Sequence, residues 1–152
     1  MTAICHCETP RDFVQVKVLT KPDKVTKVLV RFSGTSCCDV SVDKYLNDIS
    51  QVYENRHPFI LLYDATQIGR IPITLINKQA LFMRKYDNIT KDYLLRCAVI
   101  LTSEWARASL KLLFTLKPAA CPLRTFSTVQ DAKQWLKADT EFAANGATKT
   151  FQ

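Results

Sequence analysis

The residues best placed to do chemistry lie around a single carboxylate, Asp64, at the end of an apolar segment that begins at residue 59. The chain then breaks at Gly69 and resumes as an apolar helical pattern after Pro72. Ligands and partners of open α/β sheets meet the carboxyl ends of the strands, so residues 64–74 are the first candidates for a site. The residues that could contact a ligand or partner there are Asp64, Thr66, Gly69, Arg70, Thr74 and Lys78. The alternative is structural: a strand-end carboxylate that accepts backbone N–H groups of the following loop.

Metal, thiol and phosphate chemistry are all disfavoured by the spacing of the residues. A structural zinc site needs Cys or His pairs separated by two to four residues, twice over, and residues 5–7 (Cys-His-Cys) offer one pair with a one-residue gap. A cysteine nucleophile needs a nearby base, and His57 is expected at the opposite end of the sheet from Asp64. No glycine-rich phosphate motif is present. We therefore predict a non-enzymatic protein with no metal and no cofactor, in which Cys97 is a small apolar filler of a buried strand.

The positive charge is concentrated in one part of the chain. The net charge is +7, and residues 70–124 contain ten basic and three acidic residues, which accounts for all of the excess. One interpretation is an ordinary solvated helix face; the other is a basic patch that docks an acidic protein surface or anionic lipid. Nucleic acid is disfavoured because aromatic residues do not alternate with the charges. The candidate patch comprises Lys78, Arg84, Lys85, Arg107 and Lys111.

The elements that would position these residues are read from hydrophobic periodicity. Residues 13–20 and 25–33 predict an antiparallel hairpin, and 42–55 predict an amphipathic helix with Ser41 as its N-cap. Residues 59–64 are apolar without alternation, as in a central strand covered on both faces. The helix that follows has an inner stripe of Ile73, Ile76, Ala80 and Met83, with Leu75 and Phe82 beside it.

The second half of the chain continues the pattern. Residues 94–101 predict another buried strand, and Thr102 and Ser103 are N-cap candidates for the next helix. Residues 123–126 predict a short strand, and 128–131 match the capping-box pattern of a last helix. The apolar stripes are Trp105, Ala108, Leu112 and Leu116 in the first of these helices, and Ala132, Trp135 and Leu136 in the second.

The predicted order is ββαβαβαβα, which favours a single α/β domain with a mixed, mainly parallel sheet and an N-terminal hairpin. Residues 1–12 are interpreted as an N-terminal arm, 13–137 as the domain, and 138–152 as a helix end and flexible tail. The longest apolar run is far short of the roughly 20 residues of a membrane span. We expect a soluble cytoplasmic protein that is a monomer or a weak homodimer.

The segments PFILLYDATQIGRIPITLINKQALFMRK and LLRCAVILTSEWARASLKLLFTLKPAACPLRTFSTVQDAKQWL, with the hairpin and helix before them, resemble the STAS domain. The resemblance is greatest to its divergent SpoIIAA-like branch, whose members include anti-sigma-factor antagonists, and it covers residues 13–137. It implies a regulatory domain that docks a protein partner through residues 64–74 and the following helix.

In that family a serine after the strand-end aspartate is phosphorylated, within an Asp-Ser-Ser-Gly-like turn. This chain lacks the two serines, and the hydroxyl groups nearest the matching position belong to Thr66 and Thr74. The SpoIIAA-like branch also resembles lipid-binding CRAL-TRIO domains. The alternative function is therefore a carrier of a lipid or another hydrophobic ligand, with an apolar cavity under the helices near 73–83 and 105–116.

Overall fold

The computed structural model describes residues 14–19, 25–32, 39–68 and 71–144. Five strands form one sheet in the order β1-β2-β3-β4-β5, in which β1 pairs antiparallel with β2 and every other neighbouring pair is parallel. The predicted edge hairpin and mainly parallel sheet are confirmed. The predicted arm, residues 1–12, lies outside the described residues. The strands are β1 (Val14–Leu19), β2 (Thr26–Phe32), β3 (Phe59–Asp64), β4 (Leu94–Ile100) and β5 (Leu123–Phe126).

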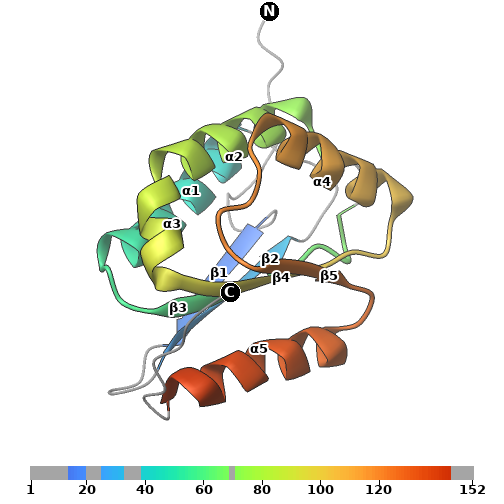
Figure 1. Cartoon of the computed structure of the whole chain (residues 1–152). Coiled ribbons are helices and arrows are strands. Elements are labelled where there is room, and N and C mark those ends of the chain that lie inside the picture. The colour runs from blue at the N-terminus through green and yellow to red at the C-terminus, as the bar shows by residue number, and fades with distance from the viewer. Residues whose placement is uncertain (1–13, 20–24, 33–38, 69–70, 145–152) are drawn as a thin grey trace, which may run out of the picture.

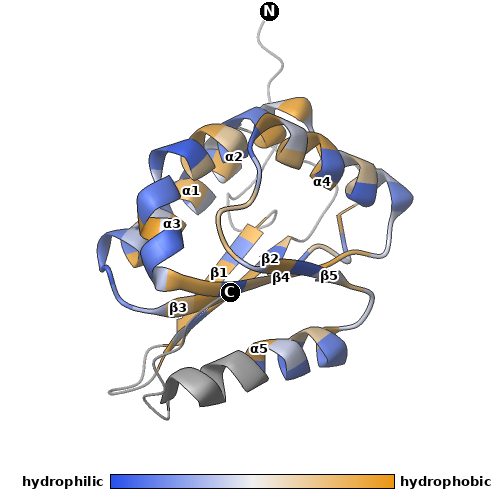
Figure 2. Ribbon diagram, viewed as in Figure 1, coloured by the Kyte–Doolittle hydropathy of each residue, from blue (hydrophilic) through white to orange (hydrophobic). Residues whose placement is uncertain are grey.

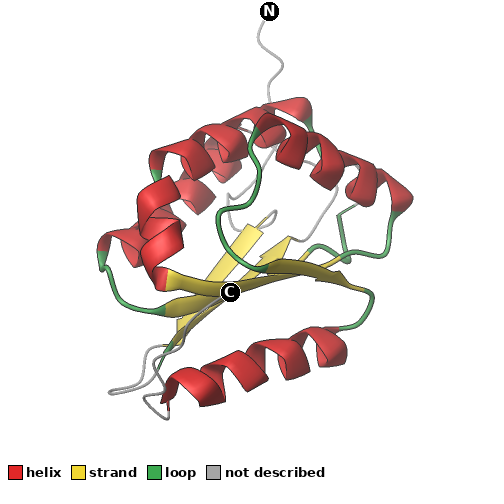
Figure 3. Cartoon of the chain, viewed as in Figure 1, coloured by secondary structure: helices red, strands yellow, loops and turns green. Residues whose placement is uncertain are grey.

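Helices cover both faces of the sheet (Figure 1). On one face lie α1, α2 and α4, with the short α3 leading into β4, and on the other face lies α5 (Figure 3). The helices are α1 (Asp39–Glu54), α2 (Ile73–Lys85), α3 (Asp87–Tyr93), α4 (Glu104–Leu116) and α5 (Val129–Ala144). The helix α3 was not predicted from the sequence. Its first residue, Asp87, forms an ion pair with Lys91 one turn later, and this spacing is the signal that could have revealed it.

The ribbon of the two central strands is largely coloured as hydrophobic, and helices lie on both sides of it (Figure 2). In β3, Phe59 and Leu61 belong to the core beneath α1 and α2, whereas Ile60 and Leu62 belong to the core beneath α5. Successive side chains of a strand point to opposite faces, so a strand covered on both sides must be apolar throughout. The prediction that 59–64 is such a strand is confirmed.

Two helix starts follow the predicted capping chemistry. The Ser103 hydroxyl accepts hydrogen bonds from the backbone N–H groups of Trp105 and Ala106, and thereby caps α4. The Thr128 hydroxyl accepts the backbone N–H of Asp131 at the start of α5. The prediction for Ser41 was wrong. The helix α1 begins at Asp39, so Ser41 lies inside its first turn and is fully buried.

The predicted inner stripe of α4 was also wrong. Trp105 is 65% exposed, Leu112 41% and Leu116 37%, whereas Ala106 is fully buried. The reason is that α4 is apolar on both sides, so periodicity offers two stripes and does not show which faces the core. In α2 the predicted stripe is buried at Ile76 and Ala80, and it was wrong only at Ile73, the first residue of the helix, which is 56% exposed.

Candidate functional site

The carboxylate of Asp64 holds the turn that follows β3. Its Oδ1 accepts the backbone N–H of Thr66 at 3.1 Å and the Thr66 hydroxyl at 2.7 Å, while Arg31 Nε lies 3.5 Å from Oδ2. The residue is only 7% exposed. Asp64 thus performs the structural role considered from the sequence, and one of its two oxygens is occupied by the turn itself.

Of the remaining predicted members that the structure describes, neither Thr74 nor Lys78 is among the polar partners of Asp64. Thr74 is exposed in the first turn of α2. Lys78 points toward α1, where its ammonium group forms a 2.7 Å ion pair with Asp43. Gly69 and Arg70 lie outside the described residues. The turn therefore offers a partner its exposed surface and not a converging set of polar groups.

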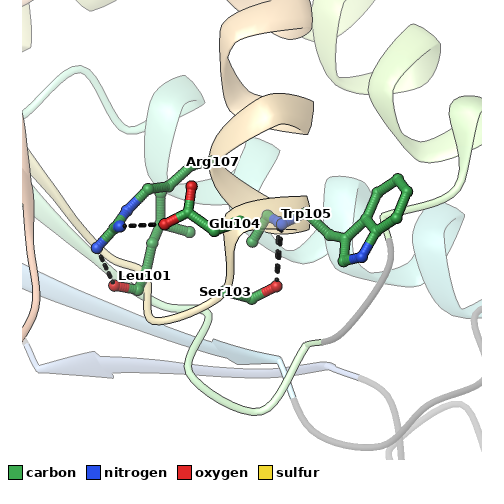
Figure 4. Close-up of polar contacts among 6 residues, drawn as sticks. Leu101, Ser103, Glu104, Trp105 and Arg107 are labelled. Atoms are coloured by element: carbon green, nitrogen blue, oxygen red, sulfur yellow. Dashed lines mark hydrogen bonds and ion pairs between the residues drawn. The ribbon is translucent and has the colours of Figure 1, made fainter.

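The predicted basic patch divides into residues with structural contacts and residues open to solvent. Arg84 donates to the Leu116 carbonyl at 2.8 Å and ties the C-terminal ends of α2 and α4 together. Arg107 forms a 2.9 Å ion pair with Glu104, and Figure 4 shows the two side chains meeting over the first turn of α4. Lys85 and Lys111 are exposed, and neither forms an ion pair within the described part of the chain, although the Lys85 ammonium lies 5.3 Å from the centroid of the Tyr86 ring.

The periodicity analysis missed an exposed apolar surface on the outer sides of α2 and α4. Figure 4 shows the Trp105 indole projecting from α4 on the side away from the Arg107–Glu104 pair. Contiguous exposed apolar patches larger than a few hundred Å² are rare on monomeric proteins and are typical of interaction sites. We call this group the α2–α4 surface, and its members are Ile73, Leu81, Trp105, Leu112 and Leu116.

An apolar cavity of about 130 Å³ lies between the sheet and the layer formed by α1, α2 and α4. The helices α2 and α4 pack on each other, and the cavity is the space that they leave above the strands. Its walls are mostly aliphatic and aromatic, and the α4–β5 connection, residues 117–122, forms one side. A cavity in this place is the feature that the sequence analysis named for a carrier of hydrophobic ligands.

Three polar side chains meet in the wall of the cavity. The Tyr45 hydroxyl, on a side chain that is 1% exposed, donates to Gln79 Oε1 at 2.8 Å and lies 2.9 Å from the Tyr63 hydroxyl. Burial raises the pKa of both tyrosine hydroxyls above their ordinary value, so both stay protonated. The tyrosine that interrupts the apolar run of β3 was the sequence signal for this cluster.

The two cysteines of the described residues also line the cavity. Burial raises the pKa of the Cys121 thiol to about 11, and it raises that of Cys97 well above its ordinary value. Thiols of this kind are protonated at neutral pH and are therefore poor nucleophiles. Cys97 is 3% exposed in β4 and fills the core, as predicted.

Within the described ranges, no three His, Cys, Asp or Glu side chains come close enough to hold a metal ion. Nor does any helix in those ranges combine the length and the apolar character needed to cross a bilayer.

No family model and no curated protein matches the sequence. Solved structures do match the fold. One is an uncharacterised protein of the DUF3478 family from Shewanella loihica PV-4, described as having a SpoIIAA-like fold. The TM-score is 0.56 at 14% identity, over 82% of this chain and 94% of that one.

The second is an anti-sigma factor antagonist from Mycobacterium paratuberculosis, with a TM-score of 0.53 at 15% identity, over 83% of this chain and 96% of that one. The protein therefore has the SpoIIAA-like α/β fold of STAS domains, and the resemblance inferred from the sequence is confirmed at the level of the fold.

Proposed function

We propose that this protein is a regulatory module that docks a protein partner through the α2–α4 surface and the neighbouring residues 64–74. The observation that carries the proposal is the exposure of five large apolar side chains on two adjacent helices. Apolar and aromatic anchors of this kind supply most of the binding free energy of protein interfaces.

The composition of α4 supports this interpretation. Its inner side is accounted for by the core and the cavity, to which Ala106, Leu110 and Leu113 contribute. Its outer side, with Leu112 and Leu116, is apolar as well. A helix with apolar side chains on two sides is typical of one that is covered on both, and a docked protein would cover the outer side.

The charges around this surface favour an acidic partner. Lys85 and Lys111 are exposed on the same two helices, and the charge of Glu104 is offset by Arg107. An apolar ridge flanked by Asp or Glu side chains would complement both features. The similarity to a solved anti-sigma factor antagonist also favours a regulatory role. A cytoplasmic location, a non-enzymatic role and a monomeric or weakly dimeric state remain predictions.

The experiment is a pull-down from extract of the source cell with the immobilised full chain. The variant is Leu112→Asp, which places a charge in the middle of the α2–α4 surface. Its matched control is Val129→Asp, because Val129 is 38% exposed on α5, on the opposite face of the sheet. We expect a protein that is captured by wild type and by Val129→Asp and is lost from Leu112→Asp. Capture that survives Leu112→Asp contradicts docking at this surface.

If phosphorylation controls docking, Thr74 is the better of the two acceptors. It is exposed in the first turn of α2, a helix that has no side-chain cap and no acidic residue in that turn. A phosphate there would be stabilised by the free N–H groups and the helix dipole. The Thr66 hydroxyl is already bound to Asp64, whose negative charge would repel a phosphate. Phosphosite mapping after incubation with source-cell extract and ATP tests this, and modification of neither threonine contradicts it.

The carrier hypothesis keeps one specific observation in its favour, which is the cavity beneath α2 and α4. Native mass spectrometry of the purified protein separates the two functions. A lipid that consistently co-purifies would favour the carrier, and its consistent absence would favour the docking module.

A further inference from the structure

We propose that the cavity between the sheet and helices α2 and α4 binds a compact, uncharged molecule of about one aromatic ring, whose single hydroxyl group is held by Tyr63 and Gln79. This inference does not rest on the docking proposal, because it concerns the inner side of α2 and α4 and not their outer side.

The size of the cavity limits the ligand. Protein interiors pack as densely as organic crystals and rarely keep voids larger than a water molecule. This cavity has a volume of about 130 Å³ and is partly open to solvent. A cavity of about 150 Å³ lined by aliphatic and aromatic groups admits benzene. One ring with a small substituent therefore fits inside it, whereas a long alkyl chain would extend beyond it.

The hydrogen bonds in the wall specify the polar group. Since the Tyr45 hydroxyl donates its only hydrogen to Gln79 Oε1, the hydrogen in the 2.9 Å contact between Tyr45 and Tyr63 belongs to Tyr63. One acceptor and one donor group then have no hydrogen-bond partner among the described residues. They are the lone pairs of Tyr63 Oη and the amide N–H groups of Gln79. A ligand hydroxyl matches both, because it can donate to Tyr63 and accept from Gln79.

The electrostatics of the cavity exclude a charged ligand. The charged side chain in its wall is Lys117, whose ammonium group is already paired with Asp87 at 2.7 Å and donates to the Pro118 carbonyl. A carboxylate in the cavity would therefore be taken out of water without a free cation to compensate it. The raised pKa values of Tyr45 and Cys97, caused by burial, report the same low polarity.

A route into the cavity lies beside α4. The side chains of Leu110, Leu113 and Cys121, which line it, are each partly exposed. Figure 1 shows the α4–β5 connection crossing in front of the space between the helical layer and the sheet. The cavity is partly open to solvent, so the ligand can reach it beside this connection without opening the sheet.

The test measures binding of four defined probes to the purified full chain by calorimetry and by the chemical shifts of backbone amides. The probes are 4-methylphenol, toluene, 4-methylbenzoate and decanoate. We expect 4-methylphenol to bind about fivefold more tightly than toluene, which is the effect of one net hydrogen bond. Amide shifts should be confined to residues around the cavity, and the two carboxylates should not bind. Absence of binding by both neutral probes at millimolar concentration overturns the proposal, and tighter binding of decanoate replaces it with a lipid site.

Three variants locate the ligand. Ala65→Leu fills the cavity from its floor and should abolish binding of both neutral probes. Ala120→Leu fills it from the α4–β5 connection, and provides the same test if Ala65→Leu does not fold. Tyr63→Phe keeps the ring and removes the hydroxyl, so 4-methylphenol should lose its advantage while toluene binds unchanged. Binding that persists in both filled variants overturns the assignment to this cavity, and an unchanged preference in Tyr63→Phe overturns the role of the hydroxyl.

Discussion

The two faces of the sheet are covered in different ways. The helix α5 packs directly on β3, β4 and β5, where Ala132 and Leu136 share one apolar core with Ile60 and Ile100. On the other face, α2 and α4 pack on each other over a cavity, and they expose apolar side chains outward. The central strands β3 and β4 contribute apolar side chains to both cores, so the difference arises from the helices.

The size of the contacting side chains explains part of this difference. Ala132 is fully buried and small, which lets the α5 backbone approach the strands. The Trp135 ring then lies beside the sheet, where the Arg96 guanidinium stacks on it at 4.6 Å and donates to its carbonyl oxygen. The α5 face thus has the features of a stabilising layer. The opposite face has the space, the polar cluster and the exposed surface that binding requires.

The largest expected effect separates the two faces by stability. Ile100 is fully buried under α5, so Ile100→Ala should lower the free energy of unfolding by about 4 kcal/mol. Leu113 is only partly buried and borders an existing cavity, so Leu113→Ala should lower it by about 1 kcal/mol. Urea unfolding of both variants measures the two losses. Equal losses would show that the cavity face is as tightly packed as the other.

Replacing one buried alanine by leucine on each face of the sheet tests the same difference in packing. Ala98 is fully buried beneath α5 and Ala65 is 4% exposed beside the cavity. Ala98→Leu should cost about 2 kcal/mol because a close-packed core cannot accept the added volume. Ala65→Leu should be neutral or stabilising, since its side chain enters space that is already there. Thermal unfolding gives both values, and a loss for Ala65→Leu as large as that for Ala98→Leu would contradict the comparison.

The fold was largely predictable because its signals are local. The largely apolar runs at 59–64 and 94–100 mark central strands, and Ser103 and Thr128 mark helix starts. The prediction of Ser41 as an N-cap was wrong because a buried serine inside a first turn has the same sequence context as an N-cap. Capping chemistry fixes where a helix can begin, and tertiary packing decides among the possibilities.

The site was less predictable because it depends on which sides of α2 and α4 face inward. The stripe of Trp105, Leu112 and Leu116 satisfies helical periodicity, yet the core takes the other side of α4. Likewise, the contact of Tyr45 with Gln79 joins residues 34 positions apart, and no spacing rule connects them. The sequence indicated where a cavity would lie, but its size and polar groups follow from packing alone.

Raising the pH should lower the stability of the protein through groups on the cavity face and not through groups on the α5 face. Burial raises the pKa of several hydroxyl and thiol groups. Four of these groups line the cavity, and they belong to Tyr45, Tyr63, Cys97 and Cys121. For Cys121 the ordinary value is 9.0 and the folded value about 11, so the folded chain binds more protons between these limits. Its contribution to stability is therefore complete below pH 9 and is lost as the pH rises through about 11.

Urea unfolding between pH 8 and pH 11 measures this loss, and Cys121→Ala should make the decline shallower. Stability that is constant or rises over this interval would contradict the prediction.

Acidic substitutions at the two threonines should have opposite effects. Thr66→Glu removes the hydroxyl that Asp64 accepts and adds a like charge, so it should lower stability by about 2 kcal/mol. Thr74→Glu adds the acidic residue that the first turn of α2 lacks, and should raise stability by about 0.5 kcal/mol. Thermal unfolding at low ionic strength compares them, with Thr74→Gln as the uncharged control. The gain at Thr74 should disappear at 1 M salt, and a gain that persists there is not electrostatic.

The smallest effect on stability should accompany a clear effect on association. Lys85 and Lys111 are exposed on the face that we propose for docking, and Lys133 is exposed on α5. Reversal of each to Glu should change the free energy of unfolding by less than about 0.5 kcal/mol, because none has an ion pair to lose within the described residues. With the captured partner, Lys85→Glu combined with Lys111→Glu should slow association several-fold and weaken its dependence on salt, whereas Lys133→Glu should not. Stopped-flow association between 50 mM and 1 M salt distinguishes these cases. Equal association rates for wild type, the double variant and Lys133→Glu would mean that the positive charge of α2 and α4 has no part in docking. The contrast between the two faces would then be one of packing alone.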